Sequence, residues 1–491
     1  MPRIHREPGR GRQAGRAALW AATILTLVGL VPGEGRAAPA VDGGFLFSAD
    51  TDLEGTRRVR ALGPIVEWSR TAAGQELLAI RPFYSRYSDP AQERMTQHFL
   101  WPLAWWRELG KERDWRFLVF LGHNFDTQNP GKRYRYWSFP LMWGRDAAGQ
   151  EYAAVIPLGG TLQEFMGRDD IRFVLFPLYA QWRINAIHTR TIAWPFYVRS
   201  TGPRVDRLLA LPFYGRYARK GEFEKKTILW PFWSSVRYDW PQEQGGGYLL
   251  FPLLGHVRTT QQDTWTVLPP LIRWAEGRKQ REYNLPWPFI QLAQGEKNKL
   301  WVWPFWCWKA TADETDQFYL WPFVEVRDHF YRGAVDHRFT VLPFLYTQSL
   351  IEDRRPDQGG GHAVTLRYFK LWPLVSYLRE GTKKRVRVLD LWPPKNTTQV
   401  ERNLAPLWTV YTHRSSARGH EDELLWGLFR FRQTVGEGTQ GSVFPLVQWR
   451  HDRTAGDCRA WDVLYGLFGY RREGTQRQYR FLYALRTGGD R

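Results

Sequence analysis

The chain has 491 residues, of which 43% are hydrophobic and 16% aromatic, with two cysteines and a formal net charge of +20. This length allows two or three ordinary domains or one large repeat array. Two cysteines in so long a chain exclude a disulfide-stabilised scaffold. The aromatic content favours an all-β fold, because aromatic side chains suit the half-buried surface of a sheet.

Residues 1–40 have the pattern of a secretory signal peptide. Five arginines precede an apolar stretch from Ala17 to Val31, and Ala38-Pro39-Ala40 fits a small-x-small cleavage site. An uncleaved membrane anchor is the alternative. We expect residues 41–491 to form a single β-repeat domain. Because residues 1–40 hold six arginines and two glutamates, that domain carries a formal charge of +16.

The first predicted elements follow directly. Gly43 to Ser48 is a candidate strand. Asp50 to Gly55 resembles half of a calcium loop, but the twelfth position would be Ala61 rather than glutamate, which favours a turn.

From here to the C-terminal region an apolar motif centred on proline recurs. The clearest copy is Leu320-Trp321-Pro322-Phe323, and softer copies have Phe-Pro-Leu or Leu-Pro-Phe. Two apolar copies lack the proline and are counted at positions 120 and 427. With them, the twenty intervals between positions 64 and 445 average about 19 residues, which is typical of a repeat architecture. The motif prolines are at 64, 82, 102, 140, 157, 177, 195, 212, 231, 252, 270, 288, 304, 322, 343, 373, 393, 406 and 445.

The stretches between motifs are predicted to be β-hairpins. Glycine and charged residues lie midway, as in Gln294 to Lys297, and the flanking residues alternate between apolar and polar. The wide interval from 343 to 373 contains a predicted flexible loop at 354–361. The fold prediction is an antiparallel meander of roughly two dozen repeated strand or hairpin units, forming either a closed barrel or a layered repeat.

The motif proline leaves two geometries open. A long strand can run through the motif and bulge there, or the chain can turn at the proline, which lacks the amide donor that a strand ladder needs. If Tyr319 to Val326 is one strand, both of its faces are apolar at the centre and charged toward the ends. Such a sheet needs cover on both faces.

No motif points to catalysis, a cofactor or a metal. His329 and His337 could meet across one hairpin and bind a metal, but solvated turn residues are the simpler interpretation. Asp169 and Asp170 would point to opposite faces of a strand and make a poor acid–base pair.

Trp274 and Trp449, each beside an arginine, could stack on sugars or bases. Their recurrence at core spacing favours a structural role.

The repeated Trp-Pro-Phe and Phe-Pro-Leu units, with the segments 167–179 and 224–233, resemble a group of uncharacterised exported proteins from Gram-negative-type bacteria. The resemblance covers nearly all of residues 41–491. It implies a location in the cell envelope and transfers no catalytic residue.

These observations predict a non-enzymatic, exported cell-envelope protein. The first hypothesis is an outer-membrane β-barrel that acts as a pore or scaffold, because an apolar band flanked by aromatic and basic residues is typical of such barrels. The alternative is a soluble periplasmic or surface β-repeat protein that binds lipid or glycan through an apolar aromatic sheet. The basic charge favours a membrane, anionic lipid or polysaccharide as partner rather than nucleic acid, and the sequence specifies no protein partner.

Overall fold

The structure is a computed structural model that describes residues 41–129, 132–331, 333–353, 362–393, 395–453, 457–483 and 485–488. The expected signal peptide at 1–40 and the expected loop at 354–361 lie outside the described residues.

The described chain consists almost entirely of short β-strands. Two short α-helices, α2 (Thr398–Asn403) and α3 (Ala405–Trp408), and two single 3-10 turns, η1 (Pro90–Gln92) and η3 (Leu425–Gly427), interrupt them. The strands in the first half are β1 Val41–Gly43, β2 Phe47–Thr51, β3 Arg57–Ala61, β4 Val66–Arg70, β5 Glu76–Ile80, β6 Tyr84–Asp89, β7 Arg94–Phe99, β8 Ala104–Leu109, β9 Glu112–Phe117, β10 Phe120–Asn124, β11 Tyr134–Ser138, β12 Leu141–Arg145, β13 Glu151–Val155, β14 Gly159–Phe165, β15 Arg168–Val174, β16 Tyr179–Ile184, β17 Ile187–Ile192, β18 Tyr197–Thr201, β19 Val205–Ala210, β20 Tyr214–Arg219, β21 Phe223–Ile228, β22 Trp233–Trp240 and β23 Glu243–Leu250. Those in the second half are β24 Leu254–Thr259, β25 Gln262–Val267, β26 Ile272–Gly277, β27 Gln280–Asn284, β28 Ile290–Gly295, β29 Asn298–Val302, β30 Trp306–Ala310, β31 Glu314–Tyr319, β32 Val324–Tyr331, β33 Ala334–Val341, β34 Leu345–Asp353, β35 His362–Leu371, β36 Val375–Glu380, β37 Lys383–Val388, β38 Tyr411–Ser416, β39 Gly419–Leu424, β40 Phe429–Thr434, β41 Gly438–Val443, β42 Val447–Asp452, β43 Cys458–Val463, β44 Phe468–Glu473, β45 Gln476–Phe481 and β46 Leu485–Thr487.

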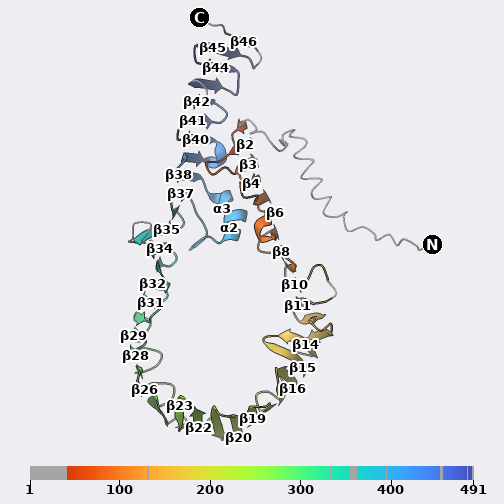
Figure 1. Ribbon diagram of the computed structural model, residues 1–491, viewed down its shortest axis with the longest axis vertical. Coiled ribbons are helices and arrows are strands. Elements are labelled where there is room, and N and C mark those ends of the chain that lie inside the picture. The colour runs from red at the N-terminus through yellow and green to blue at the C-terminus, as the bar shows by residue number, and fades with distance from the viewer. Residues whose placement is uncertain are drawn as a thin grey trace, which may run out of the picture.

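All 46 strands of the described residues belong to one sheet, and each pairs antiparallel with its neighbours in sequence. The predicted all-β antiparallel meander is therefore confirmed. The prediction of a closed barrel is wrong, because β1 pairs only with β2 and β46 pairs only with β45 among the described strands. The sheet instead bends into a ring whose two end regions lie face to face (Figure 1).

The proline motif is a tight turn that joins two hairpins. Leu320 to Phe323 connects β31 to β32, and the Phe323 amide donates to the Leu320 carbonyl at 2.9 Å. In an equivalent turn the Phe305 amide donates to the Val302 carbonyl at 2.8 Å. The Trp321–Pro322 peptide bond is cis, as in type VI turns. Proline is tolerated here because this position lies outside the strand ladder. The geometry with one long strand running through the motif is therefore wrong.

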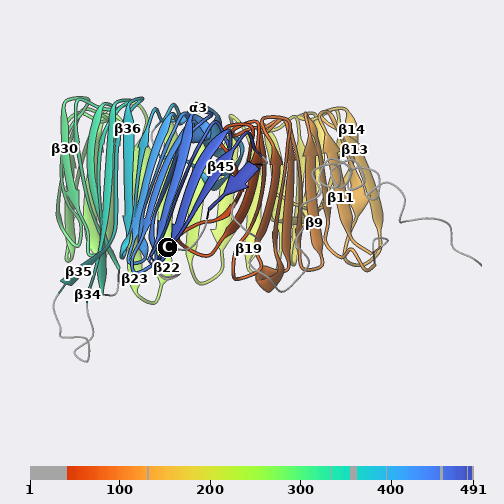
Figure 2. The same ribbon diagram turned by 90° about the horizontal axis from the view of Figure 1, so that it is seen from above.

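Neighbouring turns are joined to one another. The amide of Trp321 donates to the carbonyl of Pro304 at 2.8 Å, and that of Trp230 donates to Pro212 at 2.6 Å. All of these turns lie along one edge of the sheet, here called the turn edge, and the charged hairpin ends form the opposite tip edge. In Figure 2 the turn edge is the level upper rim, and β34 and β35 project from the uneven tip edge below.

The two faces of the ring differ in side-chain size. Residues directly opposite one another in an antiparallel pair share a face, so the register traces each face across the sheet. On the face that points into the ring, the inner face, small buried residues alternate with larger ones such as Phe173 and Trp301 along the row next to the turn edge. The matching row of the outer face is large almost throughout, as at Tyr214 and Trp233. Small inner side chains let the sheet bend inward. Examples on the inner face are Ala79, Ser85, Ala154, Ala180, Thr191, Gly215, Thr227, Cys307 and Ser376.

The ends of the sheet meet through their inner faces. We call this contact the closure region; it comprises residues 41–89 and 383–443. Arg60 on β3 pairs with Glu423 on β39, and Arg430 on β40 donates to Ser48 on β2 at 3.0 Å. Helices α2 and α3 lie inside the ring between these strands (Figure 1). Asn403 at the end of α2 accepts a hydrogen bond from Ser85 on β6.

Two predicted motif copies are exceptions. The segment around Pro393 and Pro406 forms a loop and the two helices rather than hairpin turns. The Thr397 hydroxyl caps α2 by accepting from the Val400 amide, and Pro406 lies in the first turn of α3, where a missing amide donor is tolerated. Buried Lys370 holds the preceding loop through Asp390 and Asn396, each at 3.0 Å.

At the start of the described chain the predicted strand at Gly43–Ser48 is wrong. A turn at Gly44 separates β1 from β2, because Gly44 adopts a positive φ of 58° and its amide donates to Asp42. The turn interpretation of Asp50 to Gly55 is confirmed from Asp52 onward, whereas Asp50 and Thr51 belong to β2. The Asp52 carboxylate accepts from the amides of Glu54 and Thr56, both at 2.9 Å.

Candidate functional site

The turn edge carries a continuous rim of exposed apolar side chains. In each hairpin-joining turn the residue after the proline points into solvent; Phe213 is 70% exposed and Phe323 is 53% exposed. Large apolar side chains are normally buried, so a repeated set exposed along one edge indicates a contact surface. The members after proline are Ile65, Phe83, Leu103, Leu141, Leu158, Leu178, Phe196, Phe213, Phe232, Leu253, Leu271, Phe289, Phe305, Phe323, Phe344, Leu374 and Leu446.

Next to the rim, the outer face bears a row of apolar residues in register, here called the outer apolar row. Ile228, for example, lies between Tyr214 and Trp233 on neighbouring strands. From β15 to β26 the row is Val174, Tyr179, Ile192, Tyr197, Ala210, Tyr214, Ile228, Trp233, Leu250, Leu254, Val267 and Ile272. Its pattern continues from Ile290 to Val388.

Farther from the turn edge the outer face becomes aromatic and then charged. A second row lies on the same face, two residues farther along each strand from the outer apolar row. It includes His256 and Trp265, whose ring centroids are 4.0 Å apart. The next Trp in this row, Trp274, stacks on Trp265 at 6.4 Å. A third row includes Arg258 and Asp263, which are direct cross-strand partners. From β23 to β27 the outer face thus changes from apolar to aromatic to ionic over about 13 Å, at roughly 3.3 Å per residue. From β17 to β21 the second row is basic instead, as at Arg190, Arg199 and Lys226.

This gradient corrects two expectations. The apolar centre of the motif is not a band on both faces of a strand, because Leu320 to Phe323 form a turn at the edge. Trp274 and Trp449 are not inward core residues; both lie in the aromatic row of the outer face and are half-buried. The period of about 19 residues gave their recurrence but not the face on which they lie.

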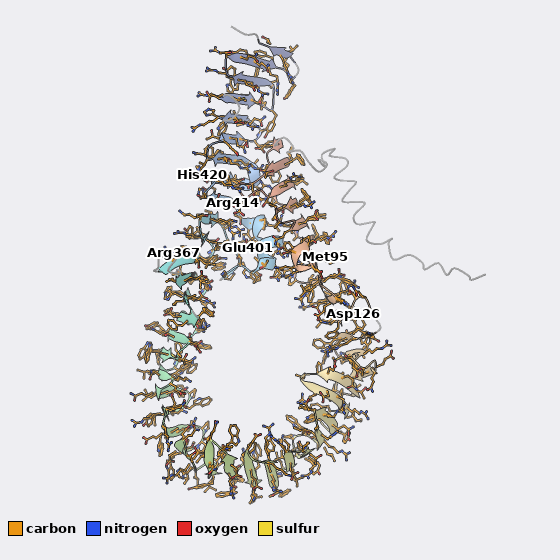
Figure 3. All side chains as sticks on the ribbon, in the orientation of Figure 1. Met95, Asp126, Arg367, Glu401, Arg414 and His420 are labelled. Carbon is orange, nitrogen blue, oxygen red and sulfur yellow. The ribbon has the colours of Figure 1, made fainter. Side chains whose placement is uncertain are left out.

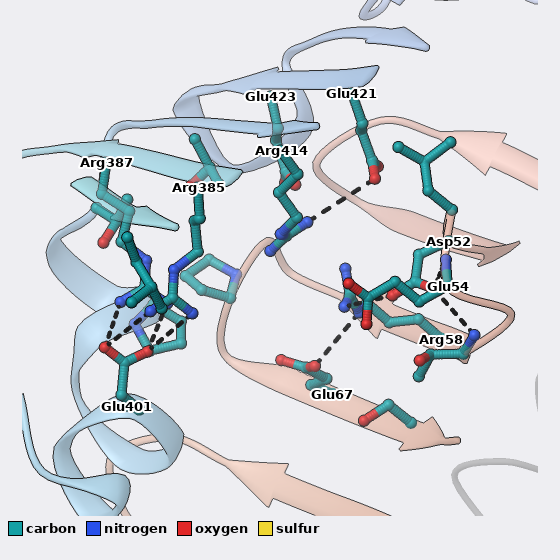
Figure 4. Close-up of a pocket in the computed structure, with 18 of the residues that line it drawn as sticks. Asp52, Glu54, Arg58, Glu67, Arg385, Arg387, Glu401, Arg414, Glu421 and Glu423 are labelled. Atoms are coloured by element: carbon teal, nitrogen blue, oxygen red, sulfur yellow. Dashed lines mark hydrogen bonds and ion pairs between the residues drawn. The ribbon is translucent and has the colours of Figure 1, made fainter. Parts of the chain in front are cut away.

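A second candidate site lies between the ends of the sheet. A pocket of about 550 Å³ is bounded by the turn between β2 and β3, by β3–β5 and β36–β39, and by the two helices (Figure 4). It extends from Pro64 and Trp426 near the turn edge to Glu54 and Ser416 near the tip edge. Its lining holds nine Arg or Lys side chains and seven Asp or Glu side chains, an excess of two positive charges.

Three carboxylates in this pocket are held ionised by arginines. Burial alone would raise the pKa of Glu423, but the charges of Arg60, Arg430 and Arg414 together outweigh burial and lower that pKa to about 2. Arg81 and Arg58 do the same for Glu67, and Arg387 and Arg385 for Glu401, whose pKa values also fall to about 2 despite burial. Each carboxylate is thus stabilised in its charged form by at least one nearby guanidinium.

Two arginines in the pocket are less well neutralised. Arg385 and Arg414 are direct cross-strand partners on β37 and β38, and both point inward (Figure 4). Figure 3 shows Arg414 and Glu401 in the space between the two ends of the sheet. Arg385 shares Glu401 with Arg387, and its contacts of 3.4 Å and 3.5 Å are longer than the 2.7 Å contact of Arg387. Burial and the charge of Arg387 lower the pKa of Arg385 to about 10. Arg414 has a long ion pair of 3.9 Å with Glu421.

The structure separates the residues considered for metal or acid–base chemistry. His329 is opposite Asp336 and His337 is opposite Asp328, so the two histidines are on opposite faces of the hairpin. Asp170 pairs with Arg183 at 2.8 Å, while Asp169 accepts from the Asn185 amide. Within the described residues no group of three or more His, Cys, Asp and Glu is arranged to hold a metal ion. Cys307 and Cys458 are both free and buried.

Sequence reasoning missed the polar pocket. Its residues come from two segments more than 300 positions apart, as the 363-residue separation of Arg60 and Glu423 illustrates. The only local signal was the inward charge of β37, Lys383 to Val388, which alternates Arg385 and Arg387 with valines on the other face.

No known protein-family model matches the chain, and no curated protein is significantly similar to it. Among the described helices, none has the length and apolar character needed to cross a membrane.

Proposed function

We propose that the protein is a non-enzymatic, exported component of the cell envelope that lies on a membrane through its turn edge. The observation that supports this proposal is the continuous rim of exposed apolar side chains together with the outer apolar row. This is the lipid-binding alternative of the sequence analysis. The barrel hypothesis is not carried forward, because the sheet is not closed.

The dimensions favour contact with one leaflet. The rim and the outer apolar row extend about 7–10 Å along the strands, which matches the depth to which interfacial elements enter the boundary between head groups and acyl chains. Most strands have five to eight residues, fewer than the nine to eleven that a membrane-spanning strand uses. The aromatic row then lies at the level of the head groups, where Trp and Tyr are enriched.

Charge supports an anionic lipid surface. Residues 41–491 carry a formal +16. The second outer row includes Arg190 and Arg199, which are cross-strand partners, and Arg216 beside Lys226. Cations at this level lie within reach of lipid phosphates, and each contributes about 1 kcal/mol near an anionic membrane.

Vesicle co-sedimentation tests the proposal. The wild-type chain is expected to bind vesicles of phosphatidylcholine with phosphatidylglycerol. A variant with Phe213, Phe232, Phe305 and Phe323 each changed to Glu is expected to lose most of this binding, because charges at an apolar interface oppose insertion. A control with four exposed, neutral tip-edge residues changed to Glu (Ala148, Gln242, Ala312 and Thr382) lowers the net charge by the same four units and should keep most of the binding.

A depth measurement makes the test sharper. An environment-sensitive dye can be attached to the new thiol of Phe323→Cys at the turn edge. Its fluorescence emission should shift to the blue when vesicles are added, and brominated acyl chains should quench it. The same dye on Lys279→Cys, at the tip edge, should not respond. Equal responses at both positions would overturn the proposal. So would sedimentation equilibrium that shows a dimer formed through the turn edge, combined with no binding to vesicles.

A further inference from the structure

We propose that the pocket of the closure region is a binding site for a phosphate-bearing anion, held between the guanidinium groups of Arg385 and Arg414. This inference is independent of membrane binding, because the pocket lies between the inner faces of the sheet ends, whereas the exposed apolar rim lies on the turn edge.

The first argument is the like-charge pair. Arg385 and Arg414 are directly opposite on adjacent strands, so their Cα atoms are about 5 Å apart. Like charges in this arrangement destabilise a sheet unless a counter-charge lies between them. Neither arginine has a carboxylate of its own at close range, because Glu401 binds Arg387 at 2.7 Å and Glu421 binds Arg432 at 3.0 Å.

A second inward-facing pair shows the difference. Arg327 and Arg338 are also direct cross-strand partners, on β32 and β33. There each guanidinium has its own carboxylate, Asp316 at 2.7 Å for Arg327 and Asp336 at 2.5 Å for Arg338. The sheet therefore neutralises such a pair locally at one position and leaves it open to the pocket at the other.

The third argument is the set of donors that lack acceptors. Among the described residues that line the pocket, four buried donor atoms have no hydrogen-bond partner: Arg414 Nη1, Arg58 Nε, and Arg60 Nε and Nη2. The single buried acceptor in the same state is Glu421 Oε2, so unpartnered donors outnumber acceptors among these described residues. Buried donors of this kind are costly unless a bound group satisfies them.

The chemistry of the ligand follows from these donors. Planar guanidinium groups bind phosphate oxygens in a forked geometry, and the excess of two positive charges in the lining matches a dianionic phosphate. The pocket volume of about 550 Å³ leaves space for a group larger than phosphate alone. A free phosphate compound and a phospholipid head group share this chemistry.

Calorimetric titration of the full chain with two probes tests the site and its source of phosphate. The probes are inorganic pyrophosphate and dihexanoyl phosphatidic acid below its micelle concentration. Saturable binding of either probe, weakened at least tenfold by Arg414→Gln and unchanged by the matched Arg338→Gln, supports the site. Tighter binding of the lipid by tenfold or more assigns it to a head group, and comparable or weaker lipid binding assigns it to a free phosphate compound.

A second variant keeps the test decisive if Arg414→Gln does not fold. Thr412 lies opposite Arg387 and two residues from Arg414 on the same face, so Thr412→Asp places a carboxylate in the pocket. Pyrophosphate should raise the melting temperature of the wild type and have no effect on Thr412→Asp. Absence of saturable binding to the wild type, or binding that Arg338→Gln reduces and Arg414→Gln or Thr412→Asp does not, overturns the proposal.

Discussion

Arg60 on β3 and Glu423 on β39 are separated by 363 residues in the chain, yet their Nη1 and Oε1 atoms lie 2.5 Å apart. Both side chains are almost fully buried, with exposed fractions of 11% and 9%. The ring is therefore completed by side-chain contacts between two faces of the sheet, with no strand pairing across the junction among the described residues.

This closure is expected to be sensitive to acid. The pKa values of Glu423 and Glu67 are lowered from 4.5 to about 2 in the folded protein, because nearby arginines outweigh the effect of burial. A carboxylate with a lowered pKa stabilises the fold above its unfolded pKa and loses that contribution as pH falls toward the folded value. Stabilisation of the closure region should therefore be complete above about pH 5 and disappear between pH 4.5 and 2. Each such carboxylate contributes roughly 2–3 kcal/mol.

Small-angle X-ray scattering between pH 7 and pH 2 measures this opening, with far-ultraviolet circular dichroism as the control for sheet content. The radius of gyration should increase below pH 4.5 while the strand signal persists. A ring whose dimensions stay constant to pH 2 would contradict the role of these carboxylates.

Loss of the α2 carboxylate should loosen the helices. Glu401 accepts from Arg387 at 2.8 Å and from Asn396 at 3.0 Å, and Glu401→Gln leaves Arg385 and Arg387 without a counter-charge. Breaking a buried ion pair costs about 3–5 kcal/mol. Because a quarter of the Glu401 side chain is exposed, we expect a loss near 2 kcal/mol after allowance for solvent screening.

Native-state hydrogen exchange of the amides of α2 measures that loss. The matched control is Glu224→Gln, which removes a 2.8 Å ion pair with Arg216 on the outer face. Solvent-accessible pairs contribute at most about 1 kcal/mol. Similar effects of the two substitutions would show that Glu401 has no special role in closure.

The thiol of Cys307 is expected to be unreactive in the folded protein. Burial raises its pKa to about 11, so only a very small fraction is thiolate at pH 8, and thiolate is the reactive form. In Cys458→Ser protein, reaction with a disulfide reagent at pH 8 should be at least about 100-fold slower in the native state than in guanidinium. A native rate close to the denatured one would place Cys307 at the surface.

The small residues of the inner face should limit what the bend can accommodate. Ala180 is 2% exposed and faces into the ring between Phe173 and Thr191. Ala180→Leu is expected to destabilise the protein by about 1–3 kcal/mol through overpacking. Ala218→Leu, on the outer face, should change stability by less than about 0.5 kcal/mol. Denaturant midpoints compare the two, and equal midpoints would argue against crowding on the inner face.

Much of the local architecture could be predicted from the sequence. The spacing of the prolines gives the number of hairpins, and the glycine and charged residues midway between them give the tip edge. The position of the chain reversal at Pro322 was left open. The choice depends on hydrogen bonds between successive turns, such as Trp321 to Pro304, and no single copy of the motif contains both partners.

The closure region and the polar pocket could not be predicted in the same way. Arg60 and Glu423 belong to strands with ordinary alternating patterns, and nothing within either segment specifies the other. The segment around Pro393 has the sequence of the motif but forms a loop and helices. The local signal that distinguishes it is Thr397, which is a favourable N-cap residue for α2. The direction of the bend depends on comparing residue sizes across neighbouring strands, as with Ala180 and Thr191, rather than along one strand.

The bonds between successive turns have a consequence for the evolution of this architecture. Because each unit of about 19 residues contributes two strands in the same register and one turn at the same height, duplication of a unit lengthens the perimeter by about 9–10 Å. The depth of the apolar rim does not change. The diameter of the enclosed space can therefore vary by copy number alone, while the two terminal segments that hold the ring together stay the same.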